Sequence, residues 1–239
     1  MAALGAILAL ALPAGSTPAT RITVYAAASL TSVFPRIDKA PRYSFAGSDT
    51  LAAQLAQGAP ADVFASASPK QAELLYHDGT LRRPVVFATN KLIVLVPSSN
   101  PANIHSVYDL RRKGVKVIIG TLTVPVGAYT RQVLDSLGIT SSVMSNVVDQ
   151  EPDVKRIVAK IALGEGDAGF VYKTDARPAG KKVKTLLIPA WAQPPIHYEI
   201  AVVRKSSHRA AGRAFIKRVT SLRGRRLLEE AGFGLPKRP

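Results

Sequence analysis

Cysteine is absent from the 239-residue sequence, which excludes disulfides, thiol nucleophiles, cysteine-ligated zinc and iron–sulfur clusters. Aromatic residues make up only 6% of the chain. No segment reaches the roughly 20 apolar residues of a membrane-spanning helix. These absences favour a globular protein, and a hydrophobic content of 47% is sufficient for one large domain or for two lobes of about 100 residues each.

Sequence motifs of catalysis are also missing. The four histidines are scattered, and none lies in a HExxH or similar metal-ligand spacing. No GxSxG, Walker A or GxGxxG sequence occurs. The sequence therefore predicts neither a metal site built from side chains nor an enzyme, although a Ser–His–Asp triad assembled by the fold stays open.

Acidic residues are half as numerous as basic ones, 16 against 32, and the net charge is +16. Such an excess suggests an acidic partner such as nucleic acid or a membrane surface. The basic residues fall in short groups with few aromatics between them, so no stacking platform for bases is visible. We interpret them as solvated faces and predict no nucleic-acid partner.

The N-terminal stretch, residues 1–20, is an apolar segment of about a dozen residues followed by small residues and proline. It is too short to span a bilayer and is interpreted as a signal peptide or its remnant, with cleavage after Ala19. It lacks the basic residues that usually begin such a signal, because the first is Arg21. The alternative is a buried N-terminal helix; the signal predicts a periplasmic or extracytoplasmic protein.

Short β-rich runs alternate with helical patterns from residue 22 onward, which predicts an α/β fold with mostly parallel sheets flanked by helices. Two extended runs, 84–97 and 194–205, are longer than an average strand and predict crossings between two lobes. The first lobe would comprise residues 21–88 and 199–239, and the second lobe residues 89–198. A ligand would lie in the cleft between the lobes, at the carboxyl ends of the strands.

Four segments share one pattern, in which small residues with Ser or Pro lead directly into a helix: "AAASL", "FAGSDTLAAQ", "LTVPVGAYTRQ" and "DQEPDVKRIV". A helix N-terminus carries free backbone N–H groups, and several that converge on a cleft form an anion site. Each serine alone is readily explained as a simple helix cap. Four such starts in one two-lobed chain favour the anion site.

The same segments, with "GAPADVFASAS", "AGFVYKTDA" and "LLEEAGFGLP", resemble the periplasmic molybdate-binding proteins of molybdate ABC transporters. The similarity runs from about residue 22 to the end. The resemblance implies the two-lobed periplasmic-binding-protein fold of type II. It also implies a ligand, molybdate or tungstate, and a partner, the membrane permease of an ABC transporter. No cofactor is implied, and the binding protein would be a monomer.

Carried over by residue, the resemblance implies five contacts to a tetrahedral oxyanion: the hydroxyls and N–H groups of Ser29 and Ser48, the N–H groups of Val126 and Val154, and the phenol of Tyr172. Molybdenum would be held as its oxyanion, without direct side-chain ligands. Tyr172 and Val154 also suit a buried core. Asp49 follows Ser48, and a carboxylate in the pocket would repel a dianion. As the second residue of the helix, Asp49 is expected to point its side chain outward, where the helix dipole favours it.

The predicted function is capture of molybdate or tungstate outside the cytoplasm for uptake by an ABC transporter. The first alternative keeps the fold and changes the ligand to sulfate or another tetrahedral oxyanion. A second is an exported enzyme acting on an anionic substrate with Ser29 as nucleophile, although no base is paired with it in the sequence. The last alternative is nucleic-acid binding, which only the positive net charge suggests.

Overall fold

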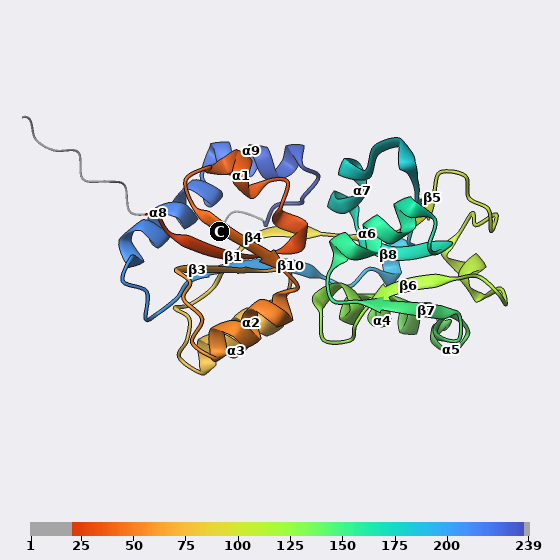
Figure 1. The fold of residues 1–239 in the computed structure, drawn as a ribbon, viewed down its shortest axis with the longest axis horizontal. Coiled ribbons are helices and arrows are strands. Elements are labelled where there is room, and N and C mark those ends of the chain that lie inside the picture. The colour runs from red at the N-terminus through yellow and green to blue at the C-terminus, as the bar shows by residue number, and fades with distance from the viewer. Residues whose placement is uncertain (1–20, 237–239) are drawn as a thin grey trace, which may run out of the picture.

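The computed structural model describes residues 21–236 and shows two β-sheets side by side, each covered by helices (Figure 1). The expected signal peptide, residues 1–20, lies outside the described residues. We call each sheet with its helices a lobe. The first lobe holds both described ends of the chain, and the second lobe is formed by the middle of the sequence.

The first sheet has the strand order β2-β1-β3-β10-β4. Its strands are β1 (Thr23–Ala27), β2 (Arg42–Ala46), β3 (Val63–Ser66), β4 (Val85–Asn90) and β10 (Ile196–Val202). The second sheet has the order β7-β6-β8-β5-β9. Its strands are β5 (Leu92–Pro97), β6 (Val117–Gly120), β7 (Val147–Glu151), β8 (Ala168–Tyr172) and β9 (Val183–Leu187). The two sheets therefore repeat one topology.

Each sheet is mixed, because one strand runs against the rest. In the first sheet β10 is antiparallel to both of its neighbours, while β1 pairs in parallel with β2 and β3. In the second sheet β5 is the reversed strand. Each reversed strand is the one that receives the chain from the other lobe. A chain that arrives from the cleft enters at the carboxyl ends of the parallel strands, and so it must run against them.

The chain passes from the first sheet to the second at Lys91, between β4 and β5. It returns after β9, through residues 188–195, into β10. Both β4 and β10 thus belong wholly to the first sheet. The end of β4 at Asn90 and the start of β10 at Ile196 each lie within three residues of the predicted boundaries at 88 and 199. The predicted lobe boundaries themselves stay predictions.

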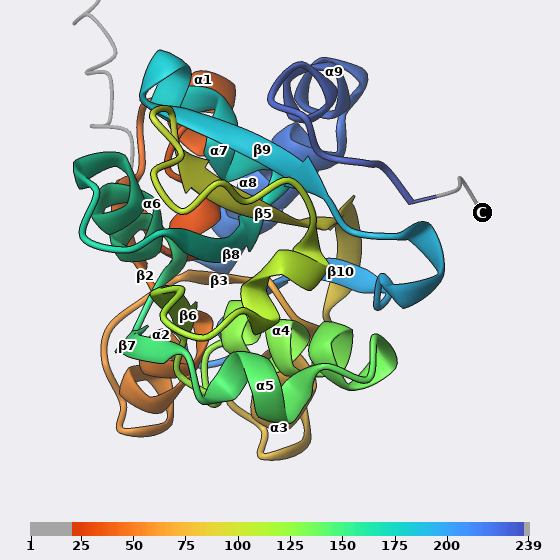
Figure 2. The same cartoon turned by 90° about the vertical axis from the view of Figure 1, so that its right-hand side faces the viewer.

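Helices cover both faces of each sheet. The first lobe has α1 (Phe34–Ile37), α2 (Ser48–Ala56), α3 (Pro69–His77), α8 (Arg209–Thr220) and α9 (Leu222–Glu230). The second has α4 (Pro125–Ser136), α5 (Thr140–Met144), α6 (Val154–Leu163) and α7 (Lys173–Ala179). Four short 3₁₀ turns are η1 (Ala28–Leu30), η2 (Val107–Arg111), η3 (Gly180–Lys182) and η4 (Ala190–Ala192). Figures 1 and 2 show α6 and α7 on one face of the second sheet and α4 and α5 on the other.

The apolar periodicity of α6 shows how sequence sets this packing. Val154, Ile157 and Ile161 are buried, and Val158 is half-buried against the same core. Gly164 ends the helix in the left-handed conformation at φ 78°, which glycine adopts without strain. Helix α6 is therefore fixed by one apolar face, and its N-terminus is aimed at the cleft.

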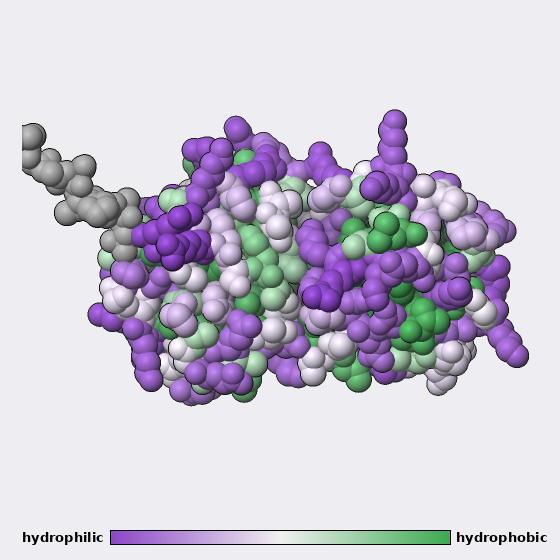
Figure 3. Space-filling view, viewed as in Figure 1, coloured by the Kyte–Doolittle hydropathy of each residue, from purple (hydrophilic) through white to green (hydrophobic). Residues whose placement is uncertain are grey.

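The surface is mainly hydrophilic on the face drawn in Figure 3, with a few separate apolar patches. Within residues 21–236, no helix combines the length and the apolar character needed to cross a bilayer.

Candidate anion-binding site

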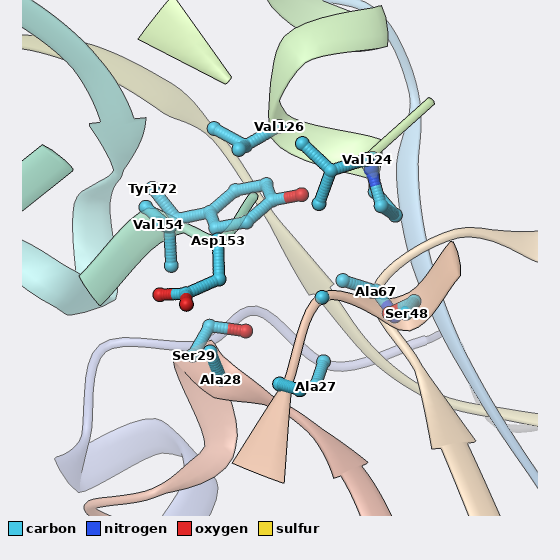
Figure 4. A pocket seen from close by; sticks show the side chains of 13 residues that line it. Ala27, Ala28, Ser29, Ser48, Ala67, Val124, Val126, Asp153, Val154 and Tyr172 are labelled. Atoms are coloured by element: carbon cyan, nitrogen blue, oxygen red, sulfur yellow. The ribbon is translucent and has the colours of Figure 1, made fainter. Parts of the chain in front are cut away.

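A small pocket lies between the lobes, where the carboxyl ends of strands from both sheets meet (Figure 4). Its lining from the first lobe consists of Ala27, Ala28, Ser29, Ala46, Gly47, Ser48 and Ala67. Its lining from the second lobe consists of Val124, Pro125, Val126, Asp153, Val154 and Tyr172. All four helix starts singled out in the sequence contribute to this one pocket.

The five residues that the family resemblance implies as ligand contacts all line the pocket. They are Ser29, Ser48, Val126, Val154 and Tyr172. None of the five is more than 3% exposed. They come from separate parts of the chain, and the fold brings them together. Their role as ligand contacts stays a prediction.

Ser29 is placed by the short turn η1, which follows β1 directly. The residues before it, Ala27 and Ala28, are small and buried, so the main chain itself forms this wall of the pocket. The Ser29 hydroxyl oxygen lies 2.9 Å from the hydroxyl oxygen of Tyr198 on β10.

Ser48 is the first residue of α2, so its N–H has no acceptor within the helix. Its hydroxyl oxygen accepts a hydrogen bond from the N–H of Ala67 at 3.0 Å. A backbone N–H can only donate, which assigns the serine oxygen as acceptor in this contact. The serine hydrogen is then free to donate into the pocket.

The second lobe presents main-chain groups. Val154 is the first residue of α6, and Val126 is the second residue of α4 after Pro125. N–H groups in the first turn of a helix have no acceptor inside that helix and carry its positive dipole end. The valine side chains are buried in the core, so the two roles of core residue and main-chain donor are compatible.

Tyr172 ends β8, and its side chain extends into the pocket beside Val126 and Val154 (Figure 4). Its hydroxyl oxygen is buried and has no hydrogen-bond partner in the described protein. Burial raises the pKa of the phenol well above its usual value, and the neighbouring Tyr198, Tyr129 and Asp175 add to this. Tyr172 therefore stays a neutral O–H donor, and a buried donor without an acceptor is costly unless a ligand supplies one.

Asp153 also lines the pocket, which the sequence analysis did not predict. Its carboxylate caps α6 by accepting hydrogen bonds from the N–H groups of Lys155 and Arg156, at 2.8 and 3.2 Å. Arg156 also lies 3.5 Å from its second oxygen. The preference of Asp for the N-cap could have identified this position, because it stands immediately before the apolar periodicity of α6.

Asp49 does not line the pocket. Its carboxylate was expected to point outward, and this expectation is wrong for one of its two oxygens, which is buried. Its Oδ1 is buried without a partner in the described protein. This oxygen lies close to Gly47, since it would be 2.7 Å from a Cβ atom at that position. The small residue at 47 leaves room for the carboxylate to fold back.

Gly47 is a further position that sequence reasoning missed. A Cβ atom there would lie 2.4 Å from the carbonyl oxygen of Pro152 and 3.1 Å from Cγ2 of Val124, both in the second lobe. A hydrogen bond from Nε2 of Gln71 to the carbonyl oxygen of Thr123, at 3.4 Å, also joins the lobes. The lobes are therefore in contact across the pocket, and the structure is a closed form.

The hydrogen-bond donors of the pocket are neutral, and its one charged lining group, the carboxylate of Asp153, is engaged by the start of α6. Among the described residues that line the pocket, none is Lys, Arg or His. Two serine hydroxyls, one phenol and the first turns of α2, α4 and α6 provide the hydrogen-bond donors. Such a set binds a dehydrated anion, because N–H and O–H groups stabilise negative charge without leaving a buried cation when the pocket is empty.

Comparison with known proteins agrees with this chemistry. The family model for bacterial extracellular solute-binding proteins matches residues 22–234. The chain belongs to this family. The molybdate-binding protein ModA of Mycobacterium tuberculosis is 39% identical over 235 residues, which cover 94% of this chain and 88% of that protein. ModA of Haemophilus influenzae is 31% identical over 232 residues, with 89% of each chain covered.

Among solved structures, the periplasmic molybdate-binding protein of Azotobacter vinelandii matches with a TM-score of 0.81 at 23% identity, covering 91% of this chain and all of that one. The match confirms the predicted periplasmic-binding-protein fold. Membership of an extracellular solute-binding family also confirms that the chain is a binding protein rather than an enzyme and that it acts outside the cytoplasm. Within residues 21–236, no cluster of three or more His, Asp and Glu side chains is suited to a metal ion.

Proposed function

We propose that this solute-binding protein captures molybdate or tungstate between its lobes and delivers it to the membrane permease of an ABC transporter. The observation that carries the proposal is the Tyr172 hydroxyl, which is buried in a pocket of donors and lacks an acceptor. A tetrahedral oxyanion supplies acceptor oxygens in several directions at once. The names of the relatives supply the identity of the oxyanion.

The donor set favours a fully deprotonated ligand. Hydrogen phosphate carries an O–H that requires an acceptor, and an unsatisfied buried O–H costs about 1 to 3 kcal/mol. Asp153 is the one carboxylate that lines the pocket; its Oδ1 accepts from two N–H groups of its own helix, and its Oδ2 lies 3.5 Å from Nε of Arg156, so a ligand proton would compete with that guanidinium for Oδ2. Sulfate has no such proton, so its exclusion must depend on size.

Closure is part of the proposal. Contacts from both lobes to one anion stabilise the closed form that the Gly47 contact describes. We propose that two lobes move as units close to the predicted division, residues 21–88 with 199–239 against residues 89–198. We propose that the protein acts as a monomer in the periplasm or another extracytoplasmic space, since one chain provides every residue that lines the pocket.

Isothermal titration against molybdate, tungstate, sulfate and phosphate tests the proposal directly. We expect molybdate and tungstate to bind at micromolar concentration or below and to raise the melting temperature, since a ligand that binds only the folded state stabilises it. Tighter binding of sulfate would support the first alternative. Absence of binding by all four anions would refute an oxyanion function.

A further inference from the structure

A chain of buried hydrogen bonds lies behind the pocket and connects it to both crossings between the lobes. The Tyr198 hydroxyl lies 2.9 Å from Oγ of Ser29 and accepts from Nδ2 of Asn90 at 3.3 Å. The same Asn90 nitrogen donates to Oγ1 of Thr174 at 3.0 Å. All four residues are buried, and neither Asn90 nor Tyr198 lines the pocket.

The direction of this chain can be assigned, beginning at Asn90. The N–H of Lys91 donates to Oδ1 of Asn90 at 2.9 Å. Because a backbone N–H never accepts, the asparagine oxygen must lie on that side, and the NH₂ group must face Thr174 and Tyr198. Both amide hydrogens are then used as donors, one to each neighbour.

The Tyr198 oxygen therefore receives a hydrogen, and its own O–H must find an acceptor elsewhere. Within the described protein, the neighbour in reach is Oγ of Ser29. If Ser29 donated to Tyr198 instead, the buried phenol hydrogen would be left unpaired, which is costly. Burial raises the pKa of Tyr198 well above its usual value, so the hydroxyl keeps its hydrogen. Ser29 is thus the acceptor in this bond.

We propose that Asn90 and Tyr198 are positioning residues that orient the Ser29 hydroxyl so that its hydrogen faces the pocket. With one lone pair of Ser29 engaged by Tyr198, the serine O–H is left to donate to the ligand. The chain from Asn90 thereby makes Ser29 a donor toward a deprotonated oxyanion and a poor acceptor for the proton of hydrogen phosphate. This inference rests on the proposed function. It assigns the preference for a deprotonated oxyanion over hydrogen phosphate to two residues, Asn90 and Tyr198, that do not touch the ligand.

The substitution Tyr198→Phe tests the inference because it removes one oxygen and keeps the ring, whose packing includes Phe233 and Tyr172. We expect molybdate affinity to fall about 3- to 10-fold, the range of one hydrogen bond, and phosphate affinity to fall less or to rise. The ratio of the two dissociation constants is the readout, since a structural defect would weaken both anions alike. Asn90→Leu, an apolar residue of similar size, should change the ratio in the same direction.

A double-mutant cycle shows whether Tyr198 acts through Ser29. In a Ser29→Ala background, Tyr198→Phe should no longer change molybdate affinity or the anion ratio. Tyr43→Phe is the matched control, because the Tyr43 hydroxyl donates to the carbonyl oxygen of Asp38 at 2.6 Å, away from the pocket. Its affinities should equal those of the unmodified protein.

Additive effects of Ser29→Ala and Tyr198→Phe, or equal losses for every anion, would overturn the inference. The titration of the unmodified protein separates this result from failure of the proposed function. If sulfate binds and molybdate does not, the proposed ligand is wrong, and the same cycle run with sulfate decides the role of Tyr198. If no oxyanion binds, both proposals are overturned.

Discussion

The two lobes have the same strand order, yet they contribute to the pocket in different chemical ways. The first lobe presents small residues and two serine hydroxyls, while the second presents valines, a proline, the capping carboxylate of Asp153 and one tyrosine. In both lobes the residues stand at the carboxyl ends of equivalent strands, where a helix or turn begins. One topology therefore supplies side-chain donors on one side and mainly main-chain donors on the other.

The difference shows which changes each lobe should tolerate. A serine hydroxyl belongs to the side chain, so most substitutions remove it. A main-chain N–H survives every substitution except proline. Valine at 126 and 154 can therefore serve the core with its side chain while its N–H serves the pocket.

Val154→Pro should produce the largest loss of affinity. Val154 is the first residue of α6, where proline fits the helix, and the preceding Asp153 is extended at φ −155° and ψ 161°, as a residue before proline prefers. The substitution thus removes the N–H with little effect on the helix. A hydrogen bond to a charged group contributes about 1.5 to 3 kcal/mol, so molybdate should bind about 10- to 150-fold more weakly in a calorimetric titration.

Val154→Ala is the matched control, because it keeps the N–H and removes buried methyl groups. It should lower the melting temperature and change the affinity less than about threefold, since its cost falls on core packing. Equal affinity losses for the proline and alanine variants would contradict a main-chain contact at this position.

Gly47→Ala should rank second, because it acts on contact between the lobes rather than on a donor. The backbone of Gly47, at φ −57° and ψ 139°, accepts any residue, and the Asp49 carboxylate, which would lie 2.7 Å from the new Cβ, can rotate toward solvent, so the open protein should fold normally. The new Cβ would meet the carbonyl oxygen of Pro152 at 2.4 Å in the closed form. Overpacking costs about 1 to 3 kcal/mol, which predicts a loss of affinity of about 5- to 150-fold.

Small-angle X-ray scattering can verify that Gly47→Ala acts on closure. With molybdate at saturation, the unmodified protein should become more compact, and the variant should change less. An unaltered ligand-free melting temperature is the expected control result. Normal compaction together with normal affinity would show that the lobes do not need to approach this closely.

Much of this arrangement could be predicted from local sequence. The alternation of β-rich and helical patterns identifies the α/β fold, and the small residues before each helix identify the four helix starts that line the pocket. Residues such as Ser29 and Tyr172 followed from a family resemblance, since nothing in their immediate neighbours shows that they share a pocket.

Other features depend on contacts between distant residues and leave no local signal. Tyr198 lies 169 residues from Ser29 and 108 from Asn90, so no periodicity or motif links them. The contact of Gly47 with Pro152 exists only when the lobes are assembled and closed. The reversed strands β5 and β10 were also missed, because strand direction depends on the route of the chain between lobes rather than on side-chain pattern.

Tyr172→Phe tests the one side-chain donor of the second lobe and should have a smaller effect than loss of the Val154 N–H. The variant removes an oxygen that has no partner in the described protein, so ligand-free stability should be unchanged or higher. Molybdate affinity should fall about 10- to 30-fold by calorimetry, the lower part of the range for loss of a single donor to a charged ligand, since this donor does not lie at the end of a helix dipole. Tyr43→Phe should again show no effect. An unchanged affinity would exclude Tyr172 from the ligand contacts.

The smallest expected effect concerns pH, and it separates the phenol of Tyr172 from an ordinary exposed tyrosine. An unperturbed tyrosine has a pKa of about 10 and would be roughly three-quarters ionised at pH 10.5, which would weaken binding about fourfold through loss of the donor. Because burial raises the pKa of Tyr172, its O–H should persist and the affinity should change less than about twofold between pH 7 and pH 10.5. The ratio of affinities of the unmodified protein and Tyr172→Phe is the measurement, since it cancels every other titrating group. A ratio that falls fourfold over this range would mean that the phenol titrates as an exposed tyrosine does, and that burial does not protect the Tyr172 donor.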